Sequence, residues 1–524
     1  MQSRTLPTPL TRAVDGCTQL WLRAAPVRDR VRDRFDVDTR SLAAVRIALG
    51  LIVLVDLIHR APYIEMFYTD NGAYPFAAYE LTYTQYNGLS IHALSGDLWF
   101  QQLLFVIAAL FAVAFVLGYR TRLVGAISLV LLFSLHARNP ALLNGGDRLV
   151  RVLLFVALVT PLGERWSIDA LRRGSARKSV ASFGTAALLV QPLVVFTANA
   201  IEKHAGNTWY TGDALQIAMA NDVMTVYLGN VIVNYPPVLT ALNYAWVTLL
   251  AGSVVFLLLP VGRIRMVAAL AYMAAFLGML TSMAVGLFPL ALAASMLPFL
   301  PAVFWDTLSR YVPERWADRL PDAADLGPLG RPPLERRVID RHRDGEYDAV
   351  VSYGVAYGRS LLTVVGFCVL VWILVFSASD VSGYDVPDEI DHSHVDQQSW
   401  GLYAPNPSSS YSWYIPRVDL ANGSSIDART GGEVDLDRPP DASAEYDTFR
   451  HRKFMQAVRD SDGGSISQGY ADWMCRQASE NYDVDAEHVR VYRMIQSSPV
   501  DGEFDEEPSR RMVIRTDCVD AAPG

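Results

Sequence analysis

The feature that most constrains this chain is a run of 39 residues, from Met266 to Phe304, that contains no charged side chain. A helix of about 20 apolar residues crosses the hydrocarbon core of a bilayer, so the run is long enough for two such helices. Gly286 and Pro289 lie between its two halves and favour a turn there. The run therefore predicts a pair of membrane-spanning helices, and it excludes an ordinary water-soluble domain.

Seven other apolar stretches are separated from this run and from one another by polar loops. They are 42–58, 98–117, 123–135, 149–162, 180–201, 238–259 and 361–376. The sequence thus predicts about nine transmembrane helices, with an all-α polytopic membrane domain over residues 42–304 and one more helix at 361–377. The stretches near residues 130 and 155 are short, so either of them could instead be a re-entrant or tilted segment.

The loops that carry most of the arginine fall on one side of the membrane if nine spans alternate. Eight arginines precede the first span, five basic residues lie in 164–179, and arginine recurs at 263 and 265 and throughout the loop 305–360. Since cytoplasmic loops carry an excess of lysine and arginine, this pattern predicts a multi-pass protein of the cell membrane. Its amphipathic N-terminal arm (1–41) and the loop 305–360 would face the cytoplasm, and the C-terminal domain would face away from it.

The chain becomes acidic after its last apolar stretch. From Asp380 to the C-terminus there are 28 acidic and 13 basic side chains, a net charge of −15. Alternation of apolar and polar residues over 410–429, around Asn422-Gly423, predicts a β-hairpin. Two helical patterns and two further strand patterns follow, at 449–458, 468–478, 488–495 and 511–519. We therefore predict a small, acidic, extracytoplasmic α+β domain over residues 378–524.

Lysine is rare in this chain, which has 45 basic residues but only Lys178, Lys203 and Lys453 as lysines. Arginine in place of lysine, together with an acidic soluble domain, is typical of a halophilic source, although a high-GC genome would give the same arginine bias. The cysteines fit no metal-binding spacing. Cys475 and Cys518 both lie in the tail, where a disulfide could persist, so they form either a bridge or two free thiols.

The strongest candidate site closes the fifth predicted span. Asn199, Glu202 and Lys203 are spaced i, i+3 and i+4, so they share one face of a helix. A lysine amine that is shielded from water can lose its proton and act as a base, whereas arginine holds its proton too firmly. In a lysine-poor chain this position favours Lys203 as a catalytic base. The alternative is a structural lysine that extends toward the interface, with Glu202 as its surface partner.

Other ionisable or polar residues lie within or at the ends of predicted spans, where they need partners. Arg46 and Asp56 belong to the first span, and Asn144 and Asp147 open the fourth. Asp147 also suits the start of a helix, so capping is an equally good explanation of the last pair. We expect Lys203 to face a buried polar pocket, with Arg46, Asp56 and Asp147 as candidate partners.

The order and spacing of these features resemble the horizontally transferred transmembrane (HTTM) domain, the membrane part related to vitamin K-dependent γ-carboxylase. The resemblance covers roughly residues 38–480. It rests on five groups of residues: Arg46–Asp56–Arg60, Asn144-Gly145-Gly146-Asp147, Pro161-Leu162-Gly163 with Trp166-Ser167-Ile168-Asp169, Glu202-Lys203 with Trp209 and Gly212, and Gln398-Ser399-Trp400-Gly401-Leu402-Tyr403-Ala404-Pro405-Asn406-Pro407.

In the carboxylase, a lysine at this helix end is thought to deprotonate reduced vitamin K, whose oxygenation then drives the carboxylation of glutamate. The resemblance therefore implies a quinol-dependent oxygenase or carboxylase-like enzyme with Lys203 as its base. It also implies a menaquinol or vitamin K-type quinol as cofactor, a peptide substrate and no metal. Glu202-Lys203 stands here where the carboxylase has paired lysines. The Asn144–Asp147 stretch lacks the histidine of its counterpart, which argues against glutamate carboxylation.

A hypothesis of a different class is a non-catalytic membrane scaffold that binds lipid or a protein partner through its tail. The missing histidine favours the scaffold, whereas a lysine retained in a lysine-poor chain favours the enzyme. Neither hypothesis involves a nucleic acid. The observation that would separate them is an elongated apolar cavity leading from the bilayer to the Lys203 amine.

Overall fold

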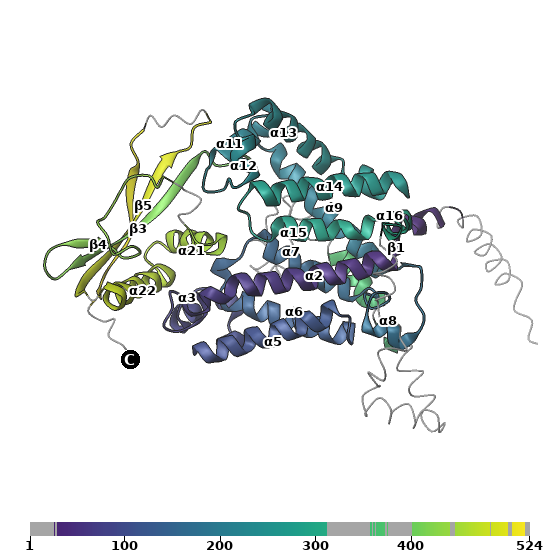
Figure 1. Ribbon diagram of the computed structural model, residues 1–524, viewed down its shortest axis with the longest axis horizontal. Helices are drawn as coiled ribbons and strands as arrows, with labels where there is room; N and C mark the ends of the chain where they lie inside the picture. Colours follow the sequence, from purple (N-terminus) through teal and green to yellow (C-terminus); the bar gives the residue numbers. More distant parts are fainter. Residues whose placement is uncertain are drawn as a thin grey trace, which may run out of the picture.

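The computed structural model describes residue 26, residues 29–311, most of 357–375, and the tail segments 401–440, 446–482, 484–500 and 506–518. The chain forms an elongated helical bundle, and a smaller domain built around a β-sheet covers one end of it (Figure 1). Residues 1–25 of the predicted N-terminal arm and most of the predicted loop 305–360 lie outside the described residues.

Seven helices of at least ten residues make up most of the bundle. They are α2 (Thr39–Arg60), α5 (Leu98–Val116), α6 (Thr121–Arg138), α7 (Gly145–Leu158), α9 (Phe183–His204), α13 (Pro236–Ala251) and α14 (Arg263–Ser282). Shorter helices join them: α3 (Ile64–Tyr68), α4 (Phe76–Leu81), α8 (Ile168–Arg173), α10 (Thr208–Thr211), α11 (Ala214–Ala220), α12 (Leu228–Ile232), α15 (Phe288–Met296) and α16 (Ala302–Ser309).

Among the described residues, five helical segments are long and apolar enough to cross a membrane. They are Thr39–Tyr68, which joins α2 to α3, and the helices α5, α6, α9 and α14. A sixth exists if Phe288–Phe299 and Ala302–Ser309, which meet at a bend of 100°, form one broken span. The structure therefore confirms a helical, multi-pass membrane domain but not the predicted number of nine.

The remaining predicted spans correspond to shorter or interrupted helices. Helix α7 has 14 residues and is about 21 Å long, less than the roughly 30 Å hydrocarbon core. Helix α13 ends at Ala251, and a π-helical turn, Val254–Leu258, replaces the second half of the predicted span. Within the last predicted span, the described residues include an apolar helix at Thr363–Trp372.

The turn predicted within the 39-residue uncharged run lies between α14 and α15. Gly286 adopts φ +67°, a left-handed conformation that suits glycine. A Cβ atom there would lie 2.5 Å from the ring of Phe449, which belongs to the tail domain. Glycine is thus required both by the backbone conformation and by the close approach of the tail.

The tail domain has an antiparallel sheet of four strands in the order β4-β3-β5-β6. Its elements are β3 (Ser410–Leu420), β4 (Ser425–Asp427), α21 (Phe449–Asp460), α22 (Ser465–Tyr482), β5 (Ala486–Ser497) and β6 (Ser509–Asp517). Each matches a predicted element within a few residues, including the hairpin around Asn422-Gly423. Helix α22 packs on the sheet, and its Cys475 forms a disulfide with Cys518, with the two Cα atoms 5.5 Å apart.

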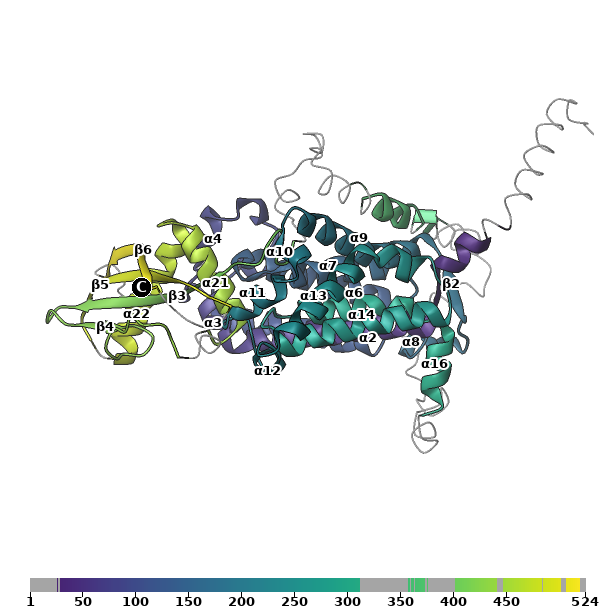
Figure 2. The ribbon, with the colours of Figure 1, turned by 90° about the horizontal axis from the view of Figure 1, so that it is seen from above.

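The two ends of the bundle differ in what they contact. At one end, β1 (Asp36–Asp38) pairs with β2 (Ser179–Ala181), near the arginine-rich segments around residues 165–178. At the other end, α21 lies between the sheet and the bundle in both views (Figures 1 and 2). The described arginine-rich segments and the tail domain therefore lie at opposite ends of the molecule (Figure 1).

Candidate functional site

Lys203 lies in the last turn of α9, at the end of the bundle that faces the tail. The helix begins with a capping box, in which Ser182 Oγ accepts a hydrogen bond from the Thr185 N–H and Thr185 Oγ1 accepts one from the Ser182 N–H (3.2 and 2.8 Å). Because α9 packs against α7, α13 and α15, its last turn is enclosed by other helices. The Lys203 residue is only 3% exposed.

The Lys203 amine contacts two groups that stabilise a cation. Its Nζ donates a hydrogen bond to the carbonyl oxygen of Leu402 (2.5 Å) and lies 3.8 Å from the centroid of the Trp209 ring. Trp209 Nε1 in turn donates to the carbonyl oxygen of Tyr403 (3.1 Å). Lys203 forms no ion pair with any residue that the structure describes. The Lys203 amine is therefore held by a backbone carbonyl oxygen and by the face of an aromatic ring.

A short segment that precedes the tail domain closes the end of α9. Asn406 Oδ1 accepts hydrogen bonds from the N–H and the hydroxyl of Thr208 (3.1 and 2.7 Å). A Cβ atom on Gly206 would lie 2.2 Å from the carbonyl oxygen of Pro405, so glycine lets the two segments approach closely. The segment 401–407 thus covers Lys203 and separates it from the bulk solvent.

A cavity of about 500 Å³ adjoins the Lys203 amine and is lined almost entirely by apolar side chains. On α14 the lining extends from Ala271 to Ser282, which is about 16.5 Å at 1.5 Å per residue. The cavity is therefore elongated along the helices. Its lining includes Ala271 and Ala274, which are exposed on the outside of the bundle, so it borders the surface that faces lipid.

The polar groups of this cavity lie at its tail end. Asn199, one turn before Lys203 on α9, is buried and lines the same cavity, as the i, i+4 spacing predicted. Glu202 lies beside them but does not line the cavity, and it is partly exposed. Lys203 is the only basic residue among the described residues of the lining. Two of the three residues predicted for this helix end thus belong to one site.

The predicted partners of Lys203 lie elsewhere, so that part of the prediction is wrong. Arg46 is fully buried and donates hydrogen bonds to the backbone carbonyls of Leu162 (2.9 Å), Arg165 (3.1 Å) and Val116 (3.2 Å). Its two terminal nitrogens, Nη1 and Nη2, bond carbonyls of two chain turns at once, which a single ammonium could do less well. Arg46 therefore stabilises the opposite end of the bundle.

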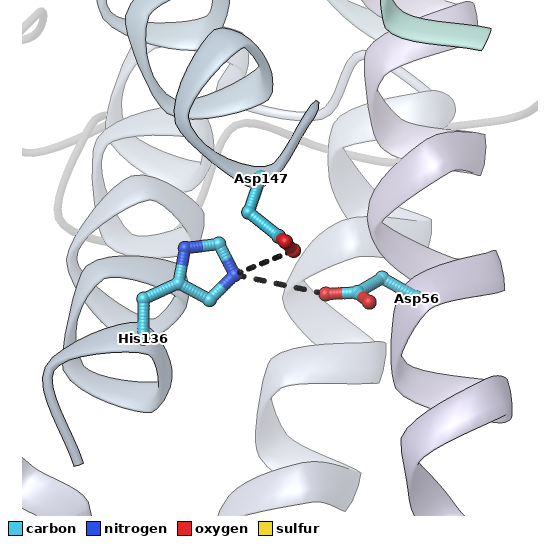
Figure 3. Close-up of side chains that lie close together, drawn as sticks. All are labelled: Asp56, His136 and Asp147. Atoms are coloured by element: carbon cyan, nitrogen blue, oxygen red, sulfur yellow. Dashed lines mark ion pairs between the residues drawn. The ribbon is translucent and has the colours of Figure 1, made fainter. Parts of the chain in front are cut away.

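Asp56 and Asp147 belong to a separate buried cluster with Arg60, His136 and Arg450. Arg60 bonds both carboxylates, with Nε 2.9 Å from Asp56 Oδ2 and Nη2 3.0 Å from Asp147 Oδ1. Arg450, from α21 of the tail, donates to Asp56 and to Asp147 Oδ1, the latter at 2.7 Å. His136 Nε2 lies 3.7 Å from Asp56 and 3.6 Å from Asp147 (Figure 3). Two carboxylates and two guanidinium groups balance in charge here.

This cluster offers one ligand atom each from Asp56, His136 and Asp147 within 4.8 Å of one another, which is close enough to hold a metal ion. Both carboxylates already accept hydrogen bonds from Arg60 and Arg450, however, and a divalent cation would add an uncompensated charge of +2 to a buried site. We therefore interpret the cluster as an ion-pair network that fixes the tail to the bundle.

Asn144 has a structural role at the same place. It caps α7 through Oδ1, which accepts hydrogen bonds from the N–H groups of Gly146 (2.8 Å) and Asp147 (3.3 Å). Asp147 Oδ2 accepts in return from the Asn144 N–H (2.9 Å). This is the capping box that the alternative explanation of the Asn144–Asp147 stretch predicted.

Several contributors to these sites were not predicted as site residues, among them His136, Arg450 and Tyr403. His136 directly follows the predicted span 123–135, so a rule that also covers the ends of spans would have selected it. Arg450 gives no such signal, because the sequence does not reveal that α21 packs against the end of the bundle. Tyr403 was quoted only as part of a motif. It lines the Lys203 cavity, and burial raises the pKa of its hydroxyl.

Comparison with known proteins gives one family match. The model of the HTTM domain matches residues 35–304, which are 270 of the 524 residues and include α9 with Lys203. No curated protein and no solved structure matches the chain. The segment 401–407 and the tail lie beyond the matched region.

Proposed function

The chain belongs to the HTTM domain family, and from this premise we propose that it is a membrane enzyme in which Lys203 takes a proton from a lipophilic quinol. The observation that carries the proposal is the elongated apolar cavity whose described lining has Lys203 as its only basic side chain. The sequence had identified such a cavity as the feature that would favour an enzyme over a scaffold.

The dimensions and chemistry of this cavity fit a prenylated ring. Its volume of about 500 Å³ lies within the range of about 300–1,000 Å³ that is typical of small-molecule sites. The alanines of α14 border the lipid-facing surface and leave room for an apolar chain to enter from the bilayer. Asn199 and Lys203 are the residues that would hold the ring oxygens, because they place polar groups at the closed end.

The surroundings of Lys203 suit a general base. An amine that is enclosed largely by apolar side chains, and that forms no ion pair with a described residue, can accept a proton, and the resulting ammonium would be held by the Leu402 carbonyl and the Trp209 ring. A guanidinium could not take this role, since it keeps its proton at any working pH. When bound, a reduced quinol would supply four electrons to O₂, two from its oxidation to the quinone and two from the ring double bond that is epoxidised, so that quinol and O₂ give quinone epoxide and water.

The experiment is an epoxidation assay on the full-length protein in detergent or in lipid nanodiscs. Reduced menaquinone is added under oxygen, and the epoxide is measured by mass spectrometry. Lys203→Arg should reduce the initial rate by at least about 100-fold, because general-base catalysis contributes typically 10²–10⁴-fold. The matched control is Lys178→Arg, which changes an exposed lysine outside this cavity and should leave the rate unchanged.

Rescue by small molecules tests the role of the amine more directly. Lys203→Ala should recover part of its activity when methylamine or ethylamine is added, and the recovery should increase with pH as the free amine becomes available. Absence of epoxide from the wild-type protein, or full activity in Lys203→Arg, would overturn the enzymatic proposal. The non-catalytic scaffold, which binds lipid or a protein partner, would then be favoured.

We further propose that the protein resides in the cell membrane with the tail outside the cytoplasm. The position of the arginine-rich segments and of the tail at opposite ends of the bundle supports this orientation. A peptide substrate would then reach the Lys203 site from the outer side, through the junction of bundle and tail. The shorter segments α7, α13 and Thr363–Trp372 would complete the set of nine as tilted or interrupted spans, together with the five long spans and the bent pair α15 and α16.

A further inference from the structure

A second cavity, of about 300 Å³, lies where the tail domain meets the bundle. Its lining combines the loop after α11, the start of β3, one face of α21 and part of β5. Tyr403 lines both this cavity and the Lys203 cavity, so the two are neighbours that share one side chain. We name this second space the junction cavity.

Three arginines line the junction cavity: Arg452 and Arg459 from α21, and Arg493 from β5. Arg459 forms an ion pair with Asp460 (2.7 Å). Arg452 and Arg493 form no ion pair with any residue in the described part of the chain. They donate hydrogen bonds instead to neutral oxygens, so that two positive charges at this cavity have no anionic partner among the described residues.

The hydrogen bonds of Arg452 and Arg493 show how they are fixed. Arg452 donates hydrogen bonds to the carbonyl oxygens of Val223 (3.1 Å) and Ala284 (2.6 Å). Its buried Nε has no hydrogen-bond partner among the described residues. Arg493 donates through Nε and Nη2 to Ser412 Oγ (3.1 and 2.9 Å). Burial lowers the pKa of both guanidinium groups. Such partly desolvated cations gain most from a bound anion.

The Tyr403 hydroxyl adds a donor of the same kind. It is buried and has no hydrogen-bond partner among the described residues. Its backbone has φ +56°, a left-handed conformation that is strained for a bulky side chain and that the contacts around Lys203 maintain. The ring is thus held at the wall between the two cavities with its hydroxyl available to a ligand.

The charge of the junction cavity is opposite to that of the domain around it. The chain from Asp380 onward carries a net charge of −15. Nevertheless, no carboxylate occurs among the described residues that line this cavity, whereas three guanidinium groups do. In a strongly acidic domain, a cavity whose charged lining residues, among those described, are all arginines is suited to binding an anion.

We propose that the junction cavity binds an oxyanion, a carboxylate or phosphate group, with Arg452 and Arg493 as its charge partners and the Tyr403 hydroxyl as a further donor. The planar guanidinium group matches both oxyanions in geometry. The anion has two possible sources, a free solute or the headgroup of a lipid whose chains enter the neighbouring apolar cavity. This inference does not depend on quinol chemistry, since it rests on a different cavity.

The test uses the full-length protein in a neutral detergent at constant ionic strength, adjusted with potassium chloride. Acetate and inorganic phosphate are titrated separately, and the melting temperature is recorded at each concentration. Binding to the folded state should raise the melting temperature along a saturable curve. Arg493→Gln should weaken the apparent affinity on the order of tenfold or more, because it removes a charge-assisted hydrogen bond. Arg515→Gln, an exposed arginine that does not line the cavity, is the matched control.

A lipid arm distinguishes the two sources of the oxyanion. Delipidated protein is titrated with phosphatidylglycerol and with diacylglycerol of the same chains, which lacks the phosphate. Selective stabilisation by phosphatidylglycerol identifies a lipid headgroup, and saturable stabilisation by acetate or phosphate identifies a free solute. In either case, the stabilisation by the ligand must be weaker in Arg493→Gln and in Tyr403→Phe than in the wild type. These two variants keep the test valid even if Arg452→Gln, the variant of the other charge partner, does not fold.

Two results would overturn the proposal. One is the absence of saturable stabilisation by all three anionic probes, and the other is equal stabilisation of the wild type, Arg493→Gln and Tyr403→Phe. The comparison of variants also removes the general stabilising effect of phosphate on proteins, which is the same for all of them. The epoxidation assay is a separate measurement, so a negative result here leaves the role of Lys203 open.

Discussion

Replacing Arg450 by methionine should destabilise the protein by about 3–5 kcal/mol, the usual effect of removing one partner from a buried ion pair. In the wild type, Asp56 and Asp147 are balanced by Arg60 and Arg450. Arg450→Met leaves two buried carboxylates with one guanidinium group. It also removes the hydrogen bonds to Asp147 Oδ1 (2.7 Å) and to the Leu142 carbonyl (3.2 Å). The unbalanced negative charge accounts for most of the expected loss.

A double-mutant cycle separates this charge effect from the lost packing. Asp147→Asn should destabilise the wild type, because it leaves an excess positive charge in the cluster. The same change in the Arg450→Met background should restore the balance and recover about 1–3 kcal/mol. Arg515→Met, on the exposed face of β6, is the control for loss of an arginine from the tail.

The assay is equilibrium unfolding of the purified protein in mixed micelles, followed by circular dichroism. Two results would refute the interpretation of the cluster as an ion-pair network. The first is a loss of less than about 1 kcal/mol in Arg450→Met, and the second is a double variant no more stable than Arg450→Met alone. A metal site would behave differently, since chelators would destabilise the wild type and excess divalent cation would stabilise it.

Three further predictions follow from the tail. Burial lowers the pKa of His451 to about 4, below its unfolded value near 6.5, so the unfolded state binds more protons between these values. Stability should therefore be full above pH 6.5 and decrease by roughly 3 kcal/mol as the pH falls to 4, and His451→Phe should flatten this part of the stability curve. Reduction of the Cys475–Cys518 bridge, or Cys475→Ser, should destabilise the tail by about 4 kcal/mol for a loop of 43 residues, measured by unfolding with and without reductant. Ser425→Cys should react with an impermeant maleimide in intact cells, and protection until lysis would place the tail in the cytoplasm.

Much of the fold could be predicted from local sequence patterns. The apolar run from Met266 separates into α14 and α15 at Gly286 because a glycine conformation and a close contact are needed there. The tail elements follow the periods of their apolar residues. The number of spans could not be predicted in this way, since a stretch such as 149–162 is apolar enough for a membrane helix but folds as only 14 helical residues.

The candidate site could be predicted only where its residues share one helix. Asn199 and Lys203 are one turn apart, so their spacing alone places them together. The partners of Lys203 come from residue 209 and from residue 402, and no periodicity connects positions that are 199 apart in sequence. Likewise, Asp56 was a candidate partner of Lys203 because both residues were expected to be buried. In the structure, Asp56 forms an ion pair with Arg450 from the tail instead.

The contacts of Lys203 and Tyr403 show which parts of the two cavities lie within the HTTM domain and which lie beyond it. The HTTM match ends at residue 304, but the Lys203 amine bonds to Leu402, and Tyr403 forms the wall between the two cavities. The bundle therefore supplies Lys203 and the apolar cavity, whereas the tail supplies the closure over Lys203 and the arginines of the junction cavity. If Lys203 is the base that we propose, two proteins that share the bundle but differ in the tail would keep the same proton acceptor and present it to different second ligands. The second ligand that we propose for this chain is consequently to be sought through the junction cavity, with variants of Tyr403, Arg452 and Arg493, rather than through the bundle alone.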